Sequence, residues 1–223
     1  MRFRVALAVL GLVAGLAGAP NVRAMTFERV TAGQCAQRAC VLAKGPIDNR
    51  SVAGLVAFAR EAKLGEGSIV FLDSLGGDHV AGIALGREIR KRGFDTFVAG
   101  SDGRGGFVKS DCASACVYMF VGGVRRGAAE DSRVGVHQLA MVNPKSAPEG
   151  VTNAQWLMGL AADHIQDMGA NPQLLSLALK TPSQAMYWLS RRELRAGRAI
   201  TLDVGLAKRA DGLGALSFFE VTQ

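Results

Sequence analysis

Proline and linker sequence are both scarce in this chain of 223 residues, which contains six prolines. No Ser- or Pro-rich segment, block of like charges, low-complexity stretch or solenoid-type repeat interrupts it. Linkers of that kind usually separate domains, so their absence argues against a second domain. The 199 residues from 25 to 223 are enough to enclose one full hydrophobic core. We therefore expect a single domain over residues 25–223.

Long apolar runs are scarce as well, since one occurs at the beginning of the chain and no other reaches its length. It extends without a charge from Val5 to Ala19, after two arginines and before Val-Arg-Ala at 22–24. Its length of about 15 residues is short of the roughly 20 that span a bilayer as a helix. The pattern predicts a secretory signal peptide over residues 1–24, a periplasmic or secreted protein, and no stable membrane span after cleavage. The alternative is an N-terminal anchor that is retained.

Charge of one sign is in small excess. The signal takes three of the 26 basic residues and no acidic one, so the mature chain keeps 23 basic and 19 acidic side chains, net +4. The densest basic run, REIRKR at 87–92, ends a predicted helix, where cations favour the helix dipole and usually face water. We therefore expect no nucleic-acid partner.

Cysteine is limited to Cys35, Cys40, Cys112 and Cys116. An even number in an exported chain favours disulfides, and two local pairs are the simplest connectivity. The second local pair conflicts with a regular helix, because side chains four residues apart on a helix rarely meet disulfide geometry, so crossed pairing stays open. The spacing Cys-x4-Cys followed by Cys-x3-Cys is uncommon for zinc, and we expect no metal.

The chain does contain an alternation of strand and helix patterns. SIVFLD at 68–73 is a continuous apolar run of the buried-strand type, and residues 79–92 repeat apolar side chains at helical spacing. FDTFVA at 94–99 and SRVGVHQ at 132–138 predict further strands, and most of the chain from 151 onward has helical periodicity. Such alternation predicts an α/β fold with parallel strands.

A glycine pair follows the first of these buried strands. Gly76 and Gly77 stand in DSLGGD at 73–78. Glycines tolerate positive φ and let a ligand approach the backbone, and N–H groups at the start of a helix suit a developing oxyanion. A tight connection between strand and helix is the structural alternative.

Two more chemically capable residues are Ser114, within CASAC at 112–116, and His137, within GVHQ at 135–138. The serine lies where a loop passes into the apolar stretch ACVYMF, so we expect it in the first turn of a buried helix, which favours an anion. A neutral imidazole has a suitable proton affinity for activating a hydroxyl. Each residue alone is better explained structurally, the serine as a cap or small packing residue and the histidine as a hydrogen-bonded core or rim residue. Together with the glycine pair they favour a nucleophile and its base.

FLDSLGGDHVAGIALGREIRKRGFDTFV, CASACVYMFVGGVRR and VGVHQ together resemble the Clp protease proteolytic-subunit group of serine peptidases, which has the ClpP/crotonase fold. The likeness is greatest to uncharacterised exported relatives with a Ser-x-Gly-Gly turn and a Cys-x-Ser-x-Cys box. It extends from about Gly45 to Leu202. It implies an α/β spiral of repeated β-β-α units with a helical C-terminal part.

Position by position, the resemblance implies Ser114 as the nucleophile and His137 as its general base. It also implies an oxyanion hole formed by backbone N–H groups, from Gly76 or Gly77 and from Ala115.

The sequence departs from the family at the third catalytic residue. The place of the family's acid falls at or near Met186, and no carboxylate lies between Asp167 and Glu193. Without a carboxylate the imidazole loses its tautomer lock and the charge that stabilises imidazolium. Asp163 or Asp167 could substitute, or a backbone carbonyl could hold the ring.

The resemblance implies hydrolysis of peptide bonds in a peptide or protein substrate, without metal or organic cofactor, by a protein that self-associates as a homo-oligomer. Two alternatives stay open: an inactive binding or assembly module of the same fold, and a hydrolase of small esters. The remaining histidines are better explained structurally. His79 follows the glycine turn and could line the cleft, but a first-turn helix residue is the better interpretation, and His164 is interpreted as a helix-face residue.

Overall fold

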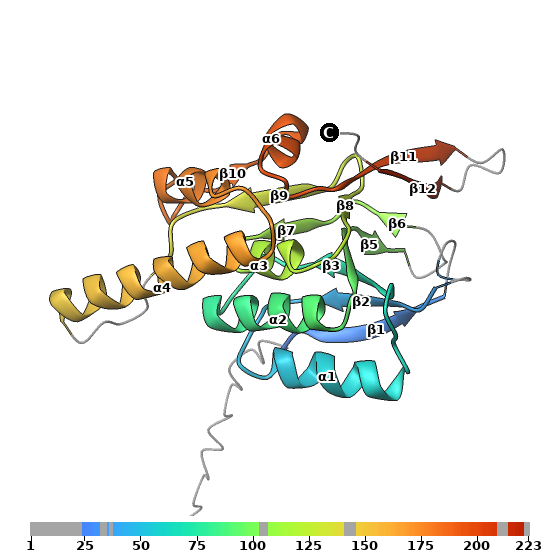
Figure 1. The fold of residues 1–223 in the computed structure, drawn as a ribbon, viewed down its shortest axis with the longest axis horizontal. Coiled ribbons are helices and arrows are strands. Elements are labelled where there is room, and N and C mark those ends of the chain that lie inside the picture. Colours follow the sequence, from blue (N-terminus) through green and yellow to red (C-terminus); the bar gives the residue numbers. More distant parts are fainter. Residues whose placement is uncertain are drawn as a thin grey trace, which may run out of the picture.

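The structure is a computed structural model that describes residues 24–31, 35, 38–102, 107–140, 146–208 and 214–220. From residue 203 onward only the backbone is described. The predicted signal peptide, except for Ala24, lies outside the described residues. Within the described chain, no helix combines the length and the apolar character needed to cross a membrane. The described residues form an α/β arrangement of several sheets and helices, as the sequence predicts (Figure 1).

The largest sheet has five strands in the order β1-β2-β3-β4-β8. The first strand is antiparallel to its neighbour, and the other pairs are parallel. The predicted buried strand is β3, whose first four residues are all buried. The strands are β1 (Thr26–Val30), β2 (Cys40–Lys44), β3 (Ile69–Asp73), β4 (Asp95–Val98) and β8 (Arg126–Ala128).

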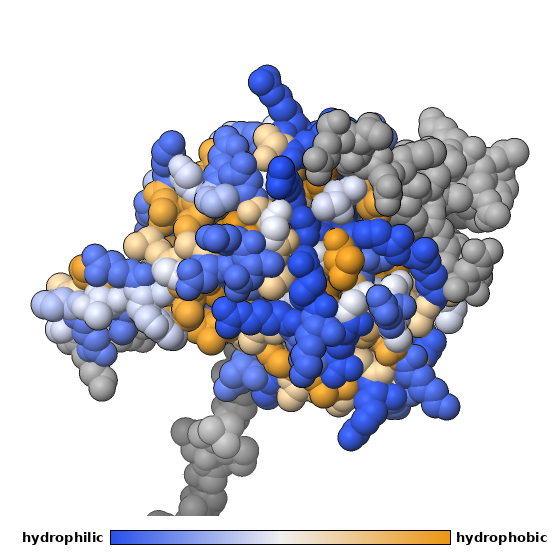
Figure 2. Space-filling model, viewed as in Figure 1, coloured by the Kyte–Doolittle hydropathy of each residue, from blue (hydrophilic) through white to orange (hydrophobic). Residues whose placement is uncertain are grey.

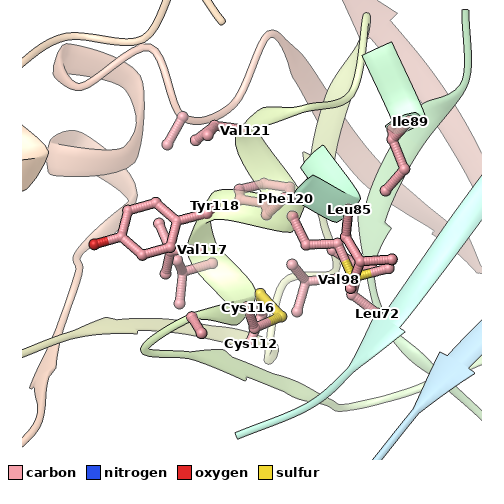
Figure 3. Close-up of a cluster of buried hydrophobic side chains, with 14 of the residues drawn as sticks. Leu72, Leu85, Ile89, Val98, Cys112, Cys116, Val117, Tyr118, Phe120 and Val121 are labelled. Carbon is pink, nitrogen blue, oxygen red and sulfur yellow. A yellow bond between two sulfur atoms is a disulfide. The ribbon is translucent and has the colours of Figure 1, made fainter. Parts of the chain in front are cut away.

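Three helices connect these strands and cover one face of the sheet (Figure 1). They are α1 (Ser51–Glu61), α2 (His79–Lys91) and α3 (Cys116–Val121). The start of α2 is fixed by Asp78, whose side chain accepts a hydrogen bond from the N–H of Ala81 at 2.7 Å. The main hydrophobic core lies between these helices and the sheet (Figure 3). A smaller apolar cluster lies on the opposite face.

A second sheet, of three strands, stands beside the end of β3. It is ordered β10-β9-β7, with β7 and β9 parallel and β10 antiparallel to β9. Ser74 joins the two sheets, because its N–H donates to the backbone carbonyl of Asp111 and its own carbonyl accepts from the N–H of Ala113. This link brings the turn after β3 next to β7. The strands are β7 (Asp111–Ala113), β9 (Arg133–Val136) and β10 (Tyr187–Trp188).

The C-terminal part is helical up to residue 196 and then ends in a hairpin that the periodicity did not predict. The longest helix, α4, projects beyond the rest of the molecule at its N-terminal end (Figure 1). The helices are α4 (Ala147–Asp167), α5 (Gln173–Lys180) and α6 (Arg191–Ala196). The terminal hairpin is β11 (Leu202–Lys208) with β12 (Gly214–Glu220), and a small one pairs β5 (Gly100–Ser101) with β6 (Phe107–Val108).

Two arginine side chains donate hydrogen bonds to backbone carbonyl groups at the C-terminal ends of three helices. Arg90 donates to the carbonyl oxygens of Gly123 at 2.8 Å and Met168 at 3.2 Å. The buried Arg126 donates to the same two at 3.1 Å each and to Arg198 at 2.7 Å. The partial negative charge at helix C-termini stabilises these cations. Arg90 corrects our expectation that its basic run faces water, since it is half-buried and holds the ends of α3 and α4 together.

Candidate active site

Ser114 occupies a sharp turn between β7 and α3. Its φ is +56°, in the left-handed region that is rare for a residue other than glycine. Its N–H donates to the carbonyl of Gly135 at 2.9 Å, and its own carbonyl accepts from Val117 at 3.0 Å. A strained residue at a strand-to-helix turn projects its side chain away from both elements, as nucleophilic serines in other hydrolases do. The half-buried Ser114 hydroxyl faces a cleft.

A buried disulfide closes this turn. Cys112 and Cys116 are bonded, with their Cα atoms 5.3 Å apart and both residues fully buried (Figure 3). The expected conflict with helix geometry does not arise, because Cys112 belongs to β7 and Cys116 is the first residue of α3. Cys35 and Cys40 form the other disulfide, so the pairing is the simplest one that the sequence allows.

The glycine turn after β3 packs directly against Ser114. Gly76 has φ +97°, and a Cβ there would lie 2.7 Å from the carbonyl oxygen of Ala113 and 2.8 Å from Cβ of Ser114. Gly77 has φ +142°, and a Cβ there would lie 2.1 Å from the carbonyl oxygen of Ile47. Side chains are therefore excluded at both positions by backbone angle and by contact.

The two glycine N–H groups differ in what they can offer to a substrate. The N–H of Gly76 donates to the hydroxyl of Ser74 at 3.1 Å. In the described chain, the N–H groups of Gly77 and Ala115 donate to no acceptor. An unpartnered N–H next to a candidate nucleophile is what oxyanion stabilisation requires. Of the two glycines that the sequence left open, Gly77 is the one with a free donor.

His137 follows β9 and lines the same cleft as Ser114. Its Nδ1 lies 3.1 Å from the carbonyl oxygen of Ser183. A carbonyl can only accept, so the neutral ring carries its proton on Nδ1 and leaves the Nε2 lone pair free to act as a base. No direct hydrogen bond joins Ser114 to His137 in the described residues, and such contacts often tighten only when substrate binds.

None of the described carboxylates is hydrogen-bonded to the His137 ring. Asp163 and Asp167, the two acids that we considered, lie on the exposed side of α4 and make no hydrogen bond to His137. The pairing of β10 with β9 sets Tyr187 opposite Val136, so the preceding Met186 falls beside His137. The backbone carbonyl, our other alternative, is the group found at Nδ1.

The cleft has polar groups at one end and apolar walls around them. His79, Tyr118 and Gln138 join Ser114 and His137 as its polar residues, and it continues between α4 and α5. Among the residues that the structure describes, no Lys, Arg, Asp or Glu lines it. The apolar lining comprises Val117, Val136, Leu139, Leu157, Met158, Ala161, Ile165, Leu174, Leu175, Ala178 and Leu179.

His79 is the first residue of α2, as the sequence predicts, and it also lines the cleft, the alternative to which the sequence gave second place. Its pKa is lowered to about 4, first by burial and then by the charge of His137, while Asp78 acts in the opposite direction. Tyr118 was missed altogether. Helical spacing from Ser114 gives no signal for it, because Ser114 lies in the turn before α3 and not on that helix as we expected.

His164 lies on the buried face of α4 and has no exposed surface. Its Nε2 is 2.9 Å from the carbonyl oxygen of Tyr118. A Cβ at Gly86 would lie 2.8 Å from this ring, so His164 fills the space between α2, α3 and α4. Burial lowers its pKa. The residue is structural and stands behind the cleft rather than in it.

The described residues contain no group of three or more His, Cys, Asp or Glu side chains that could hold a metal ion. The arrangement can support acyl transfer. The Ser114 hydroxyl and the His137 ring line one cleft, and the N–H groups of Gly77 and Ala115, which donate to no described acceptor, belong to the two turns that meet at Ser114. Comparison with known proteins adds no family, because no family model matches the chain and no curated protein matches its sequence.

Proposed function

We propose that this chain is an exported serine peptidase of the ClpP/crotonase type that hydrolyses peptide bonds through Ser114 and His137. The observation that carries the proposal is the position of Ser114, held at φ +56° beside the free N–H groups of Gly77 and Ala115. Strain at such a site persists only where the surrounding structure enforces it, and a purely structural turn needs no free donors.

Ser114 Oγ attacks the substrate carbonyl carbon while its proton passes to Nε2 of His137. The new C–O bond places negative charge on the former carbonyl oxygen, and the two free N–H groups donate hydrogen bonds to it. The C–N bond then breaks, and His137 gives its proton to the departing amine. Water attacks the acyl-serine in the same manner, with His137 as base, and releases the acid and the free serine.

The fold supports the assignment in part. The parallel units β2–α1–β3 and β3–α2–β4 place the glycine turn at a strand end, and β7 and α3 place the serine next to it. We infer that these are the repeated units of the ClpP/crotonase spiral. Two disulfides support an oxidising compartment and thus export.

An inactive binding module is the second candidate, and one observation favours it. His137 is held by a carbonyl and not by a carboxylate, so nothing nearby neutralises the imidazolium that forms during the reaction. Such a site works slowly or not at all. A small-ester hydrolase would use the same residues, with esters cleaved faster than peptides.

Labelling with a fluorophosphonate probe distinguishes these candidates. The protein beginning at Met25 is compared with Ser114→Ala, His137→Ala and Ser176→Ala, the last removing an exposed hydroxyl outside the cleft. We expect wild type and Ser176→Ala to label equally and the other two not to label. Absence of labelling in the wild type would support the binding module. Labelling that survives in Ser114→Ala would reject the proposed nucleophile.

We also infer that the protein self-associates. The projecting half of α4 leaves Val151 and Trp156 exposed by 58% and 59%, and apolar side chains surface where α4 meets the body of the molecule (Figure 2). An exposed tryptophan of this kind usually marks an interface. Analytical ultracentrifugation tests it: Trp156→Glu is expected to lower the sedimentation coefficient of the assembly, and a wild-type monomer would contradict the inference.

A further inference from the structure

Tyr118 has a hydroxyl that the protein does not use. The side chain is only 9% exposed, yet its hydroxyl has no hydrogen-bond partner in the described chain. Figure 3 shows the ring leaving the apolar cluster with its oxygen at the far end, away from the core. The hydroxyl oxygen is not among the fully buried polar atoms that lack a partner in the described residues, so it is open to the cleft that Tyr118 lines. Phe120, two residues later, fills a fully buried site without a hydroxyl.

His79 stands against this tyrosine. The two rings meet edge to face, with centroids 5.2 Å apart. The His79 nitrogens also have no partner among the described residues. The neighbouring Asp78 carboxylate does not supply one, because it is turned to the N–H of Ala81. Both rings line the cleft from the side of Ser114 and His137 into the apolar groove between α4 and α5.

The pair offers hydrogen bonds without charge. Burial raises the pKa of Tyr118 to about 12, and the pKa of His79 is lowered to about 4, so both are neutral across the physiological range. A phenol donates one hydrogen bond, and a neutral imidazole donates with one nitrogen and accepts with the other. A peptide amide carries the matching acceptor and donor. A carboxylate or ammonium would lose its hydration there, and none of the described lining residues carries an opposite charge to replace it.

We propose that Tyr118 and His79 form a subsite that hydrogen-bonds an uncharged backbone amide of the substrate, next to an apolar side chain in the groove between α4 and α5. The proposal rests on the proposed function, since it concerns the same cleft, and it names the substrate class. Internal peptide segments fit this subsite. Free peptide termini and simple alkyl esters do not.

Inactivation rates test the subsite in the working protein. Wild type and Tyr118→Phe are treated with two probes: a plain alkyl fluorophosphonate and an N-acetylated peptidyl phosphonate of alanine and leucine. Tyr187→Phe is the matched control, because it removes the chain's other tyrosine hydroxyl, which bonds Glu193 outside the cleft. We expect Tyr118→Phe to slow the peptidyl probe about fivefold to tenfold, the effect of one hydrogen bond, and to leave the alkyl probe unchanged. An equal loss with both probes, or no loss, would overturn the subsite.

Binding without chemistry separates this proposal from the proposed function. Ser114→Ala and the double variant Ser114→Ala/Tyr118→Phe are titrated by calorimetry with an acetylated and amidated Ala-Leu tetrapeptide. We expect the double variant to bind about fivefold to tenfold more weakly, whether or not wild type reacts with any phosphonate. His79→Leu in the same background is expected to weaken binding similarly, and His79→Gln to restore part of it. Equal affinities, no binding at millimolar peptide, or preference for the peptide with free termini would reject the subsite.

Discussion

The Nδ1 atom of His137 lies 3.1 Å from the carbonyl oxygen of Ser183. The contact assigns the proton of the neutral ring to Nδ1 and leaves Nε2 without a partner among the described residues. It does not supply charge. A carbonyl dipole stabilises an imidazolium less than a carboxylate does, so the site has the tautomer lock of a catalytic triad without its full electrostatic contribution.

A carboxylate placed at Met186 should therefore accelerate the serine. Met186 falls beside His137 in the register of β10 with β9 and is half-buried. We expect Met186→Asp to raise the rate of fluorophosphonate labelling about tenfold, well below the ~10⁴ that a full triad acid contributes. Ala185→Asp adds the same charge at an exposed neighbouring position and should leave the rate unchanged. An equal rise in both variants would trace the effect to net charge instead.

Gly76 should tolerate no side chain. A Cβ there meets Ala113 and Ser114 at 2.7 and 2.8 Å, and its φ of +97° is unfavourable for any L-residue with a Cβ. We expect Gly76→Ala to lower the free energy of unfolding by about 2 kcal/mol or more, measured by urea denaturation. Gly65→Ala is the matched control, because nothing lies within 4 Å of a Cβ at that exposed position. A stable Gly76→Ala protein would mean that the turn after β3 can move away from Ser114.

The sequence located the glycine turn, the serine and the histidine because each follows or begins an element with strong apolar periodicity. Ends of neighbouring parallel strands meet at one edge of a sheet, so those residues could be brought together before any coordinates. The α/β class followed from the same alternation. The cysteine pairing was open only because the exact start of α3 was unknown, and boundaries are the weakest part of pattern reading.

What the sequence could not provide has physical causes. The group hydrogen-bonded to Nδ1 of His137 is a backbone carbonyl. Every residue has such a carbonyl, so the residue type at position 183 does not predict the contact. Tyr118 belongs to the apolar run ACVYMF. Its ring fits the apolar pattern of a buried helix, and that pattern does not predict where the hydroxyl lies. Arg90 belongs to a basic run that resembles a solvated helix end, and its four carbonyl partners come from loops distant in sequence. Contacts of that kind depend on tertiary packing alone.

Stability should fall as the solution is acidified, because of two histidines kept neutral. The folded-state pKa values of His79 and His164 are both lowered, mainly by burial. Around His164, a hydrogen bond to Tyr118 and the charge of Asp167 oppose this effect, and the charges of Arg87 and Arg90 add to it. The unfolded chain then binds more protons below the ordinary histidine pKa of about 6.5, so stability present above that pH is lost below it.

We expect the free energy of unfolding to fall between about pH 7 and pH 5, by at most about 1.4 kcal/mol per pH unit for each histidine. The contribution of His79 ceases to change below its folded pKa of about 4. Urea denaturation at several pH values measures the slope. His164→Gln keeps a donor for the Tyr118 carbonyl and cannot titrate, so its slope should be shallower than that of wild type. Parallel slopes would assign the pH dependence to other groups.

The disulfide around Ser114 should matter more for reactivity than for stability. Closing its short loop is expected to stabilise the fold by about 2 kcal/mol, and the Cys35–Cys40 loop is nearly the same size. Only the Cys112–Cys116 bond, however, holds the turn in which Ser114 adopts φ +56° and Ala115 presents its free N–H. We therefore expect Cys112→Ala/Cys116→Ala to lower the fluorophosphonate labelling rate at least tenfold, and Cys35→Ala/Cys40→Ala to leave it nearly unchanged at a similar loss of stability. Faster labelling after loss of the bond would reverse this interpretation and make the disulfide an inhibitor of the serine, which reduction would release.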